Sequence, residues 1–134
     1  MAWIKAYLTL IGDQFDPEWV TERLGIKPDS VRLPSELLSN GRLFGQTEWG
    51  METEKQEADD VEAVLQQLFV RVKDCMDDMG KLAEEASAEW NILVYVKSTV
   101  EDFPDIVFSA ETIRKMALIR ATIGFDTYIF DEWP

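Results

Sequence analysis

Two segments far apart in the chain alternate residue by residue between apolar side chains and side chains of mixed character. The apolar sets are Ile4, Ala6, Leu8 and Leu10 in residues 3–11, and Trp90, Ile92, Val94 and Val96 in residues 90–97. A period of two residues is that of a β-strand. Because each segment has only one uniformly apolar face, we expect an α+β fold, with a mainly antiparallel sheet and helices packed on one face.

A helix is predicted directly after the first strand. Asp16 has the position of an N-cap, Pro17 suits the first helical turn, and Gly25 marks the end of the helix. A longer helix is predicted from about Asp60 to Met79, where apolar residues recur at helical spacing. Its apolar stripe consists of Val61, Leu65, Leu68, Val72, Cys75, Met76 and Met79.

The remaining segments complete the order β-α-β-α-β-β-α-β. An irregular connection is predicted over 27–46, with a helical turn around 35–38, and a strand follows over 47–53. In the last third of the chain we predict a brief strand over 105–108 and a helix from Ser109 to Ala121. A break at Gly124 then precedes a strand over 125–132. A length of 134 residues fits one domain, so we expect a single α/β domain over residues 1–134.

One stretch of the sequence resembles a known family. The run Phe15-Asp16-Pro17-x-x-Val20-Thr21-x-x-Leu24-Gly25-Ile26-x-Pro28, followed by Trp49, is similar to a bacterial family of small intracellular domains of unknown function, DUF family 4279. The resemblance lies mainly over residues 5–52. It implies a single-domain α/β fold in bacteria, and it brings no established activity and no catalytic residue.

The residue types present exclude several kinds of chemistry. The chain has no histidine, which removes histidine-dependent hydrolysis and histidine-ligated metals. Cys75 is the one cysteine, so it forms no intramolecular disulfide and no thiolate cluster for a metal. We therefore expect a protein that is not an enzyme, with no catalytic residue, no metal ligand and no cofactor. A carboxylate-dependent enzyme stays open as the least favoured alternative.

The sequence also indicates a location. No apolar run approaches the roughly 18–20 residues that span a bilayer, and the segment from Met1 to Lys5 does not have the pattern of a signal peptide. We expect a soluble, cytoplasmic protein.

Charge is the feature that points most directly to a function. With 26 acidic and 13 basic residues the net charge is −13, which repels nucleic acid and anionic membranes and attracts basic proteins. We therefore expect a protein-binding module, most specifically an immunity protein that neutralises a basic toxin, and neither nucleic acid nor membrane as partner. The residues expected to bind that partner are Asp74, Asp77, Asp78, Trp19 and Trp133.

Other interpretations stay open. The acidity is equally typical of a protein that is only highly soluble. A small-molecule sensor would need a pocket between the sheet and the 27–46 connection. The mixed face of the sheet has Tyr7 and Tyr95, with Tyr128 as a third candidate, beside Lys5 and Lys97. It would suit a homodimer interface. It also has the stacking groups of a platform for single-stranded RNA, which the net charge disfavours.

Overall fold

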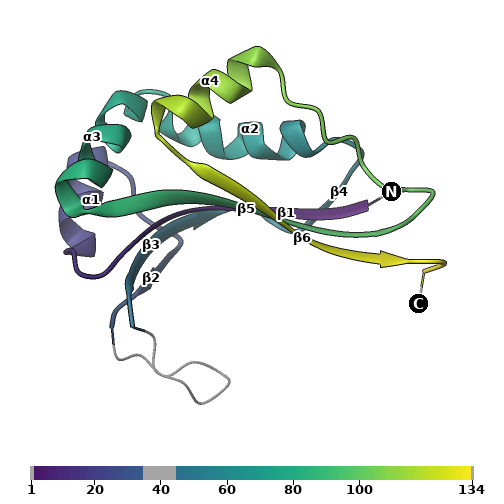
Figure 1. Cartoon of the computed structure of the whole chain (residues 1–134), viewed down its shortest axis with the longest axis horizontal. Helices are drawn as coiled ribbons and strands as arrows, with labels where there is room; N and C mark the ends of the chain where they lie inside the picture. The colour runs from purple at the N-terminus through teal and green to yellow at the C-terminus, as the bar shows by residue number, and fades with distance from the viewer. Residues whose placement is uncertain (1, 35–44, 134) are drawn as a thin grey trace.

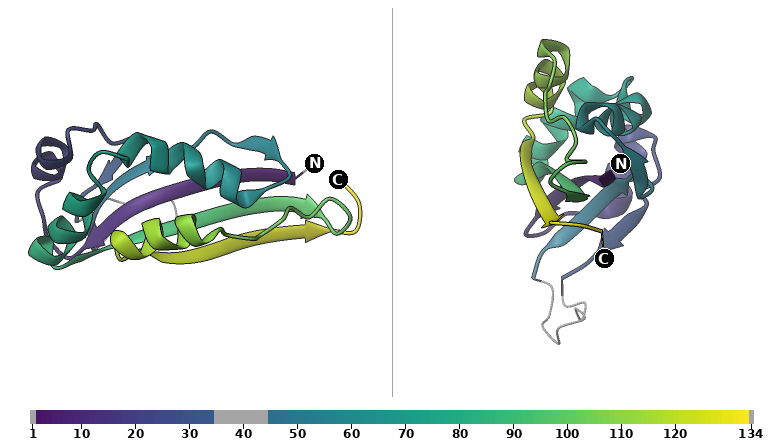
Figure 2. Two further views of the ribbon diagram at one scale, coloured as in Figure 1. Left: turned by 90° about the horizontal axis from the view of Figure 1, so that it is seen from above. Right: turned by 90° about the vertical axis from the view of Figure 1, so that its right-hand side faces the viewer.

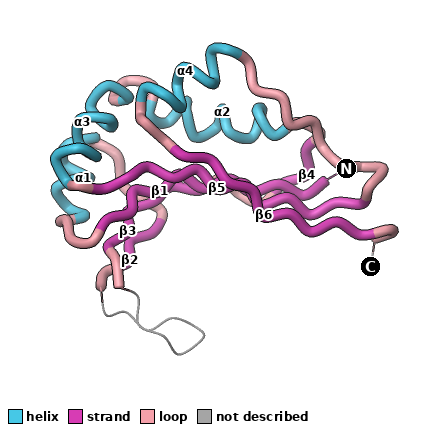
Figure 3. The backbone as a smooth tube through the Cα atoms, viewed as in Figure 1, coloured by secondary structure: helices cyan, strands magenta, loops and turns pink. Residues whose placement is uncertain are grey.

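The computed structural model describes residues 2–34 and 45–133. Figures 1 and 3 show one layer of helices above one strongly twisted sheet. In chain order the elements are β1 (Ala2–Gly12), α1 (Pro17–Leu24), β2 (Ser30–Arg32), β3 (Thr47–Glu52), β4 (Gln56–Ala58), α2 (Val61–Val72), α3 (Met76–Ala86), β5 (Ala88–Thr99), α4 (Ala110–Leu118) and β6 (Thr122–Phe130). The α+β fold class and the order of the long elements are confirmed.

The sheet is built around β1, which pairs with β3, β4 and β5. Its strand order is β2-β3-β1-β5-β6, and β4 lies beside the first residues of β1. All pairs are antiparallel except β5 and β6, which are parallel and joined through α4. The sheet is therefore mainly antiparallel, as the alternating pattern predicts.

The core lies between the sheet and the helices. The apolar sets of the first and fifth strands point toward the helices and are buried, so the alternation in the sequence correctly identifies the covered face. Trp49 of β3 and Trp90 of β5 meet edge to face, with ring centroids 5.8 Å apart. The indole of Trp90 also donates a hydrogen bond of 2.8 Å to the carbonyl of Met79 in α3.

The prediction of one long helix over 60–79 is wrong in one respect, because the structure has two helices there. α2 ends at Val72, α3 begins at Met76, and residues 73–75 form a turn between them. α2 packs on β1 and α3 packs on β5. The apolar stripe runs through both helices because both bury it against the same sheet, so helical periodicity does not reveal the change of direction.

Two further predictions need correction. The brief strand predicted at 105–108 does not form, and Asp105 makes only an isolated bridge with Asp60. Gly124 does not break the chain but lies inside β6, because Arg120, with a φ of 56°, makes the turn after α4 instead. The short strands β2 and β4 lack a sequence signal of their own. The helical turn predicted around 35–38 lies outside the described residues.

Candidate functional site

All four helices lie on one face of the sheet, and none of the described residues forms a layer over the opposite face (Figures 1 and 2). We call this opposite surface the open face. It presents the mixed sets of the alternating strands, including Trp3, Lys5 and Tyr7 from β1 and Leu93 from β5. Leu93 is 42% exposed. The open face is therefore a broad surface of mixed apolar and polar character.

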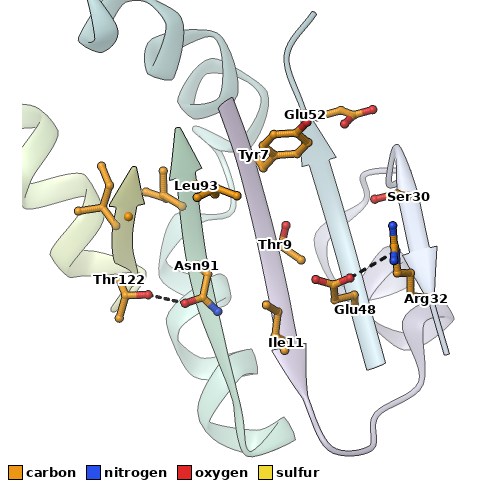
Figure 4. A pocket seen from close by; sticks show the side chains of 13 residues that line it. Tyr7, Thr9, Ile11, Ser30, Arg32, Glu48, Glu52, Asn91, Leu93 and Thr122 are labelled. Atoms are coloured by element: carbon orange, nitrogen blue, oxygen red, sulfur yellow. Dashed lines mark hydrogen bonds and ion pairs between the residues drawn. The ribbon is translucent and has the colours of Figure 1, made fainter. Parts of the chain in front are cut away.

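The open face is hollowed by a groove of about 800 Å³ (Figure 4). Five strands contribute to it. The lining residues are Tyr7, Thr9, Ile11, Ser30, Arg32, Glu48, Glu52, Asn91, Ile92, Leu93, Thr122, Ile123 and Gly124. The wall formed by β2 comes from the 27–46 connection, which is where the sequence-based alternative of a small-molecule site requires a pocket.

The register of the strands places five small residues, four of them with polar side chains, in one row across the groove. Ser30 is paired with Gly50, Gly50 with Thr9, Thr9 with Asn91, and Asn91 with Thr122. We call these five residues the polar row. A Cβ atom at Gly50 would lie 3.2 Å from the hydroxyl oxygens of both Ser30 and Thr9. Glycine therefore leaves room for both hydroxyl groups, which come from the strands on either side of β3.

The polar row offers hydrogen-bonding groups to a bound molecule. The hydroxyl of Thr122 donates to the side-chain oxygen of Asn91, which orients that amide (Figure 4). Hydroxyl groups both donate and accept hydrogen bonds. A row of this kind suits the amide groups of a peptide segment or the hydroxyl groups of a small polar molecule.

A pair of charged side chains borders the row on the side of β2. The Nε atom of Arg32 lies 3.7 Å from a carboxylate oxygen of Glu48. Burial raises the pKa of the Glu48 carboxyl, and the positive charge of Arg32 acts in the opposite direction. Glu48 is thus a partly desolvated carboxylate on the groove wall. A positively charged group of a partner would offset the energetic cost of that desolvation.

β2 is held in place by a carboxylate outside the groove. Asp29 accepts a 2.9 Å hydrogen bond from the backbone N–H of Glu52 and a 2.7 Å hydrogen bond from Arg71 of α2. Burial alone would raise the pKa of Asp29, but these two donors outweigh it and lower the pKa below its ordinary value. The groove wall is therefore tied to both β3 and the helix layer.

Beyond the groove, the open face carries aromatic rings and lysines. The rings of Tyr95 and Tyr128 lie 5.4 Å apart between centroids. The ammonium group of Lys55 is 5.9 Å from the ring of Trp3 and 5.4 Å from that of Tyr95. Lys5 lies 5.2 Å from the ring of Tyr7. The predicted grouping of tyrosines and lysines on one face is confirmed.

Some of the sequence-predicted partner-binding residues lie together at the α1–α3 end of the molecule. Trp19 is half-buried on α1, and the guanidinium of Arg23 lies 5.8 Å from its ring. Arg23 in turn contacts Asp78 of α3 at 3.2 Å and also pairs with Glu85. Arg23 therefore links the predicted tryptophan to one of the predicted aspartates, and charge counting does not identify such a residue.

The other predicted residues are more dispersed. Asp77 is exposed on α3, and Asp74 is exposed in the turn before it. β6 ends on the side of the molecule opposite α1 and α3 (Figure 1). Trp133 follows β6 in the chain, and its indole donates a 3.2 Å hydrogen bond to Asp102. The structure does not bring Trp133 together with the other four residues.

Among residues 2–34 and 45–133, no three histidine, cysteine or acidic side chains gather closely enough to hold a metal ion. Burial raises the pKa of the Cys75 thiol, and the nearby carboxylates of Asp78 and Asp74 add to the effect. None of the described helices is long and apolar enough to cross a bilayer.

The polar row had no signal in the sequence. Its members come from five strands, and each is a small residue of a common type. The alternating pattern assigns Thr9 to the mixed face, but only the pairing register shows which residues of other strands lie beside it.

Comparison with known proteins identifies a family. The family described as a domain of unknown function, DUF4279, matches residues 2–130, which is nearly the whole chain. The chain therefore belongs to this family. The match is far longer than the 5–52 segment on which the sequence resemblance rests. No curated protein and no solved structure shows significant similarity to the chain.

Proposed function

We propose that this DUF4279 domain is a non-enzymatic binding module that holds a basic partner protein on its open face. The observation that carries the proposal is the open face itself: a groove floored by the polar row, with the exposed aromatic side chains of Trp3 and Tyr128 elsewhere on the same face. Protein interfaces combine a core enriched in aromatic residues with a polar rim and about one hydrogen bond per 100–200 Å².

The charge of the molecule indicates the chemistry of the partner. Acidic side chains dominate the whole chain, with a net charge of −13. On the open face, by contrast, Lys5 and Arg32 pair with Glu52 and Glu48. The overall charge would accelerate the approach of a basic protein, and the locally balanced open face would form the close contacts.

The sharpest form of this proposal is an immunity protein in the cytoplasm that neutralises a basic toxin. In that case a projecting segment of the toxin would occupy the groove and donate hydrogen bonds to the polar row. The desolvated carboxylate of Glu48 would receive a lysine or arginine from the toxin. Inhibition would result from covering the active site of the toxin rather than from chemistry.

The test is a capture experiment with a matched pair of variants. The tagged protein is used to bind partners from its native lysate, with washes at low and high salt. We expect one abundant basic protein in near-equal amount that is lost at high salt. Leu93→Glu places a charge on the open face, and Val70→Glu makes the same change on the helix layer, where Val70 is 62% exposed.

The two variants decide which surface binds. Capture that is lost with Leu93→Glu and kept with Val70→Glu would support the open face. Capture that survives Leu93→Glu, or that fails equally with both variants, would refute this assignment. Circular dichroism of both variants establishes that they are folded.

A small-molecule sensor is the second candidate, and the position of the groove favours it. The groove extends across the open face to β2, which belongs to the 27–46 connection, and that alternative requires a pocket beside this connection. A ligand that binds only the folded state raises the melting temperature with its concentration. A panel of small polar metabolites would therefore be screened by thermal shift. A concentration-dependent rise that Leu93→Glu removes and Val70→Glu retains would favour the sensor over the protein-binding module.

A further inference from the structure

β6 is a long strand at the edge of the sheet. Its nine residues, Thr122–Phe130, pair with β5 on one side, and no described strand pairs with the other side. Most of its side chains are exposed on both faces, including Tyr128 at 47% and Ile129 at 52%. An edge strand presents a row of backbone N–H and C=O groups to which another strand can add.

The other edges of the sheet are short and carry charge, whereas β6 is neither short nor strongly charged. β2 and β4 have three residues each and contain Arg32 and Glu57 respectively. Short length, charged side chains and proline are the usual protections of an edge. β6 has no proline, lysine or arginine, and Asp126 is its one charged residue. The edge of β6 is therefore the one that lacks these protections.

The surroundings of β6 extend the apolar surface. Phe125 stacks on Phe108, with ring centroids 6.5 Å apart and an interplanar angle of 24°. The neighbouring segment exposes Val107 at 72%, and α4, which leads into β6, exposes Ile113. In a molecule with a net charge of −13, a nearly neutral strip of this length lets two copies approach with less charge repulsion than an acidic surface would.

We propose that β6 pairs antiparallel with β6 of a second copy, about a two-fold axis at Thr127. In this register Phe125 lies opposite Ile129, Asp126 opposite Tyr128, and Gly124 opposite Phe130. Cross-strand apolar pairs and an aromatic side chain over glycine are favourable. The Tyr128 hydroxyl lies 3.4 Å from the Asp126 carboxylate within one chain. In the dimer the same hydroxyl would donate a hydrogen bond to Asp126 of the second copy.

The neighbouring two-fold register is less favourable. An axis at Asp126 would place two carboxylates directly opposite each other, and like charges in that position destabilise a strand pair. With the axis at Thr127, paired side chains of the two copies point to the same side of the joined sheet, because side chains alternate with a period of two. Two sheets then become one continuous sheet, and their open faces lie side by side as a single surface.

The oligomeric state of the purified chain tests the proposal. Size-exclusion chromatography with light scattering should give a dimer for the unchanged protein. Thr127→Lys puts two positive charges beside the axis and should give a monomer with unchanged circular dichroism. A monomeric unchanged protein at high concentration would overturn the proposal. A dimer that survives Thr127→Lys and is lost with Leu93→Glu would also overturn it, because that dimer would use the open face.

Cross-linking tests the register separately. In a Cys75→Ser background, Thr127→Cys should give a covalent dimer in good yield with a short bismaleimide. Val31→Cys on the β2 edge is the matched control and should give little. Equal yields from the two positions, or none from Thr127→Cys, would contradict the register. Capture of a basic partner by the Thr127→Lys monomer would show that the proposed function does not depend on the dimer.

Discussion

At the scale of single residues, one buried tryptophan explains much of the family-like motif. Trp49 is fully buried, and its indole donates a 3.0 Å hydrogen bond to the hydroxyl of Thr21 on α1. Val20 and Leu24 of the same helix are buried beside it. The motif from Phe15 to Pro28, together with Trp49, is thus a set of contacts that fixes α1 against β3.

The contact between Thr21 and Trp49 gives a prediction at this scale. Thr21→Val keeps the shape of the side chain but removes the acceptor, which leaves the indole N–H of Trp49 without its partner. An unsatisfied buried donor costs about 1–3 kcal/mol, so the free energy of unfolding, measured in urea, should fall by that amount. Thr21→Ser keeps the hydroxyl and should lose clearly less. Equal losses for valine and serine would show that the hydrogen bond contributes little.

At the scale of elements, the close contact between α3 and α4 depends on a glycine. Gly80 lies inside α3, where a glycine ordinarily weakens a helix. A Cβ atom at this position would lie 2.8 Å from the carbonyl oxygen of Leu118, at the end of α4. Gly80 is therefore a packing residue, and the two helices approach as closely as they do because it has no side chain.

Gly80→Ala should consequently destabilise the protein. Alanine favours an isolated helix by about 1 kcal/mol over glycine, but overpacking a tight contact typically costs about 1–3 kcal/mol, and a backbone carbonyl cannot move away as a side chain can. We expect a lower urea midpoint for Gly80→Ala. Lys81→Ala, at an exposed neighbouring position of α3, is the control and should change the midpoint little. A higher midpoint for Gly80→Ala would mean that the helices separate without cost.

At the scale of the whole molecule, charge and shape have different roles. The α1–α3 end carries Asp74, Asp77 and Asp78, whereas the open face has basic and acidic side chains in contact. Long-range attraction depends on the total charge, while the lifetime of a complex depends on the close contacts. We therefore assign the aspartates to the approach of a basic partner and the open face to its retention.

Reversal of the three aspartates to lysine tests this division. The net charge would change from −13 to −7, because each reversal adds two positive charges. Association with the captured basic partner should become slower and less sensitive to salt, while dissociation stays nearly unchanged, as measured by surface plasmon resonance at two ionic strengths. Asp78 pairs with Arg23, so Asp74→Lys with Asp77→Lys is the matched double variant. An unchanged association rate would exclude the aspartates as the steering group.

The sequence and the structure agree where a pattern is local and regular. The alternation in residues 3–11 and 90–97 correctly gives two central strands and their buried face, and Asp16 caps α1 by accepting a 3.0 Å hydrogen bond from the N–H of Glu18. The predictions at Gly124 and at 105–108 were wrong, because tertiary contacts overrode weak local preferences. The open face was foreseeable from alternation, whereas the groove on it was not.

The sequence by itself determined the fold class, the central strands, the helix caps and the net charge, because these depend on neighbouring residues and on simple periodicity. Only the tertiary structure decided the polar row, the division of one apolar stripe between α2 and α3, and the exposure of the β6 edge. These features depend on which strands pair and in which register. Such pairing joins residues distant in the chain, such as Thr9 with Asn91, and leaves no periodic trace in either segment.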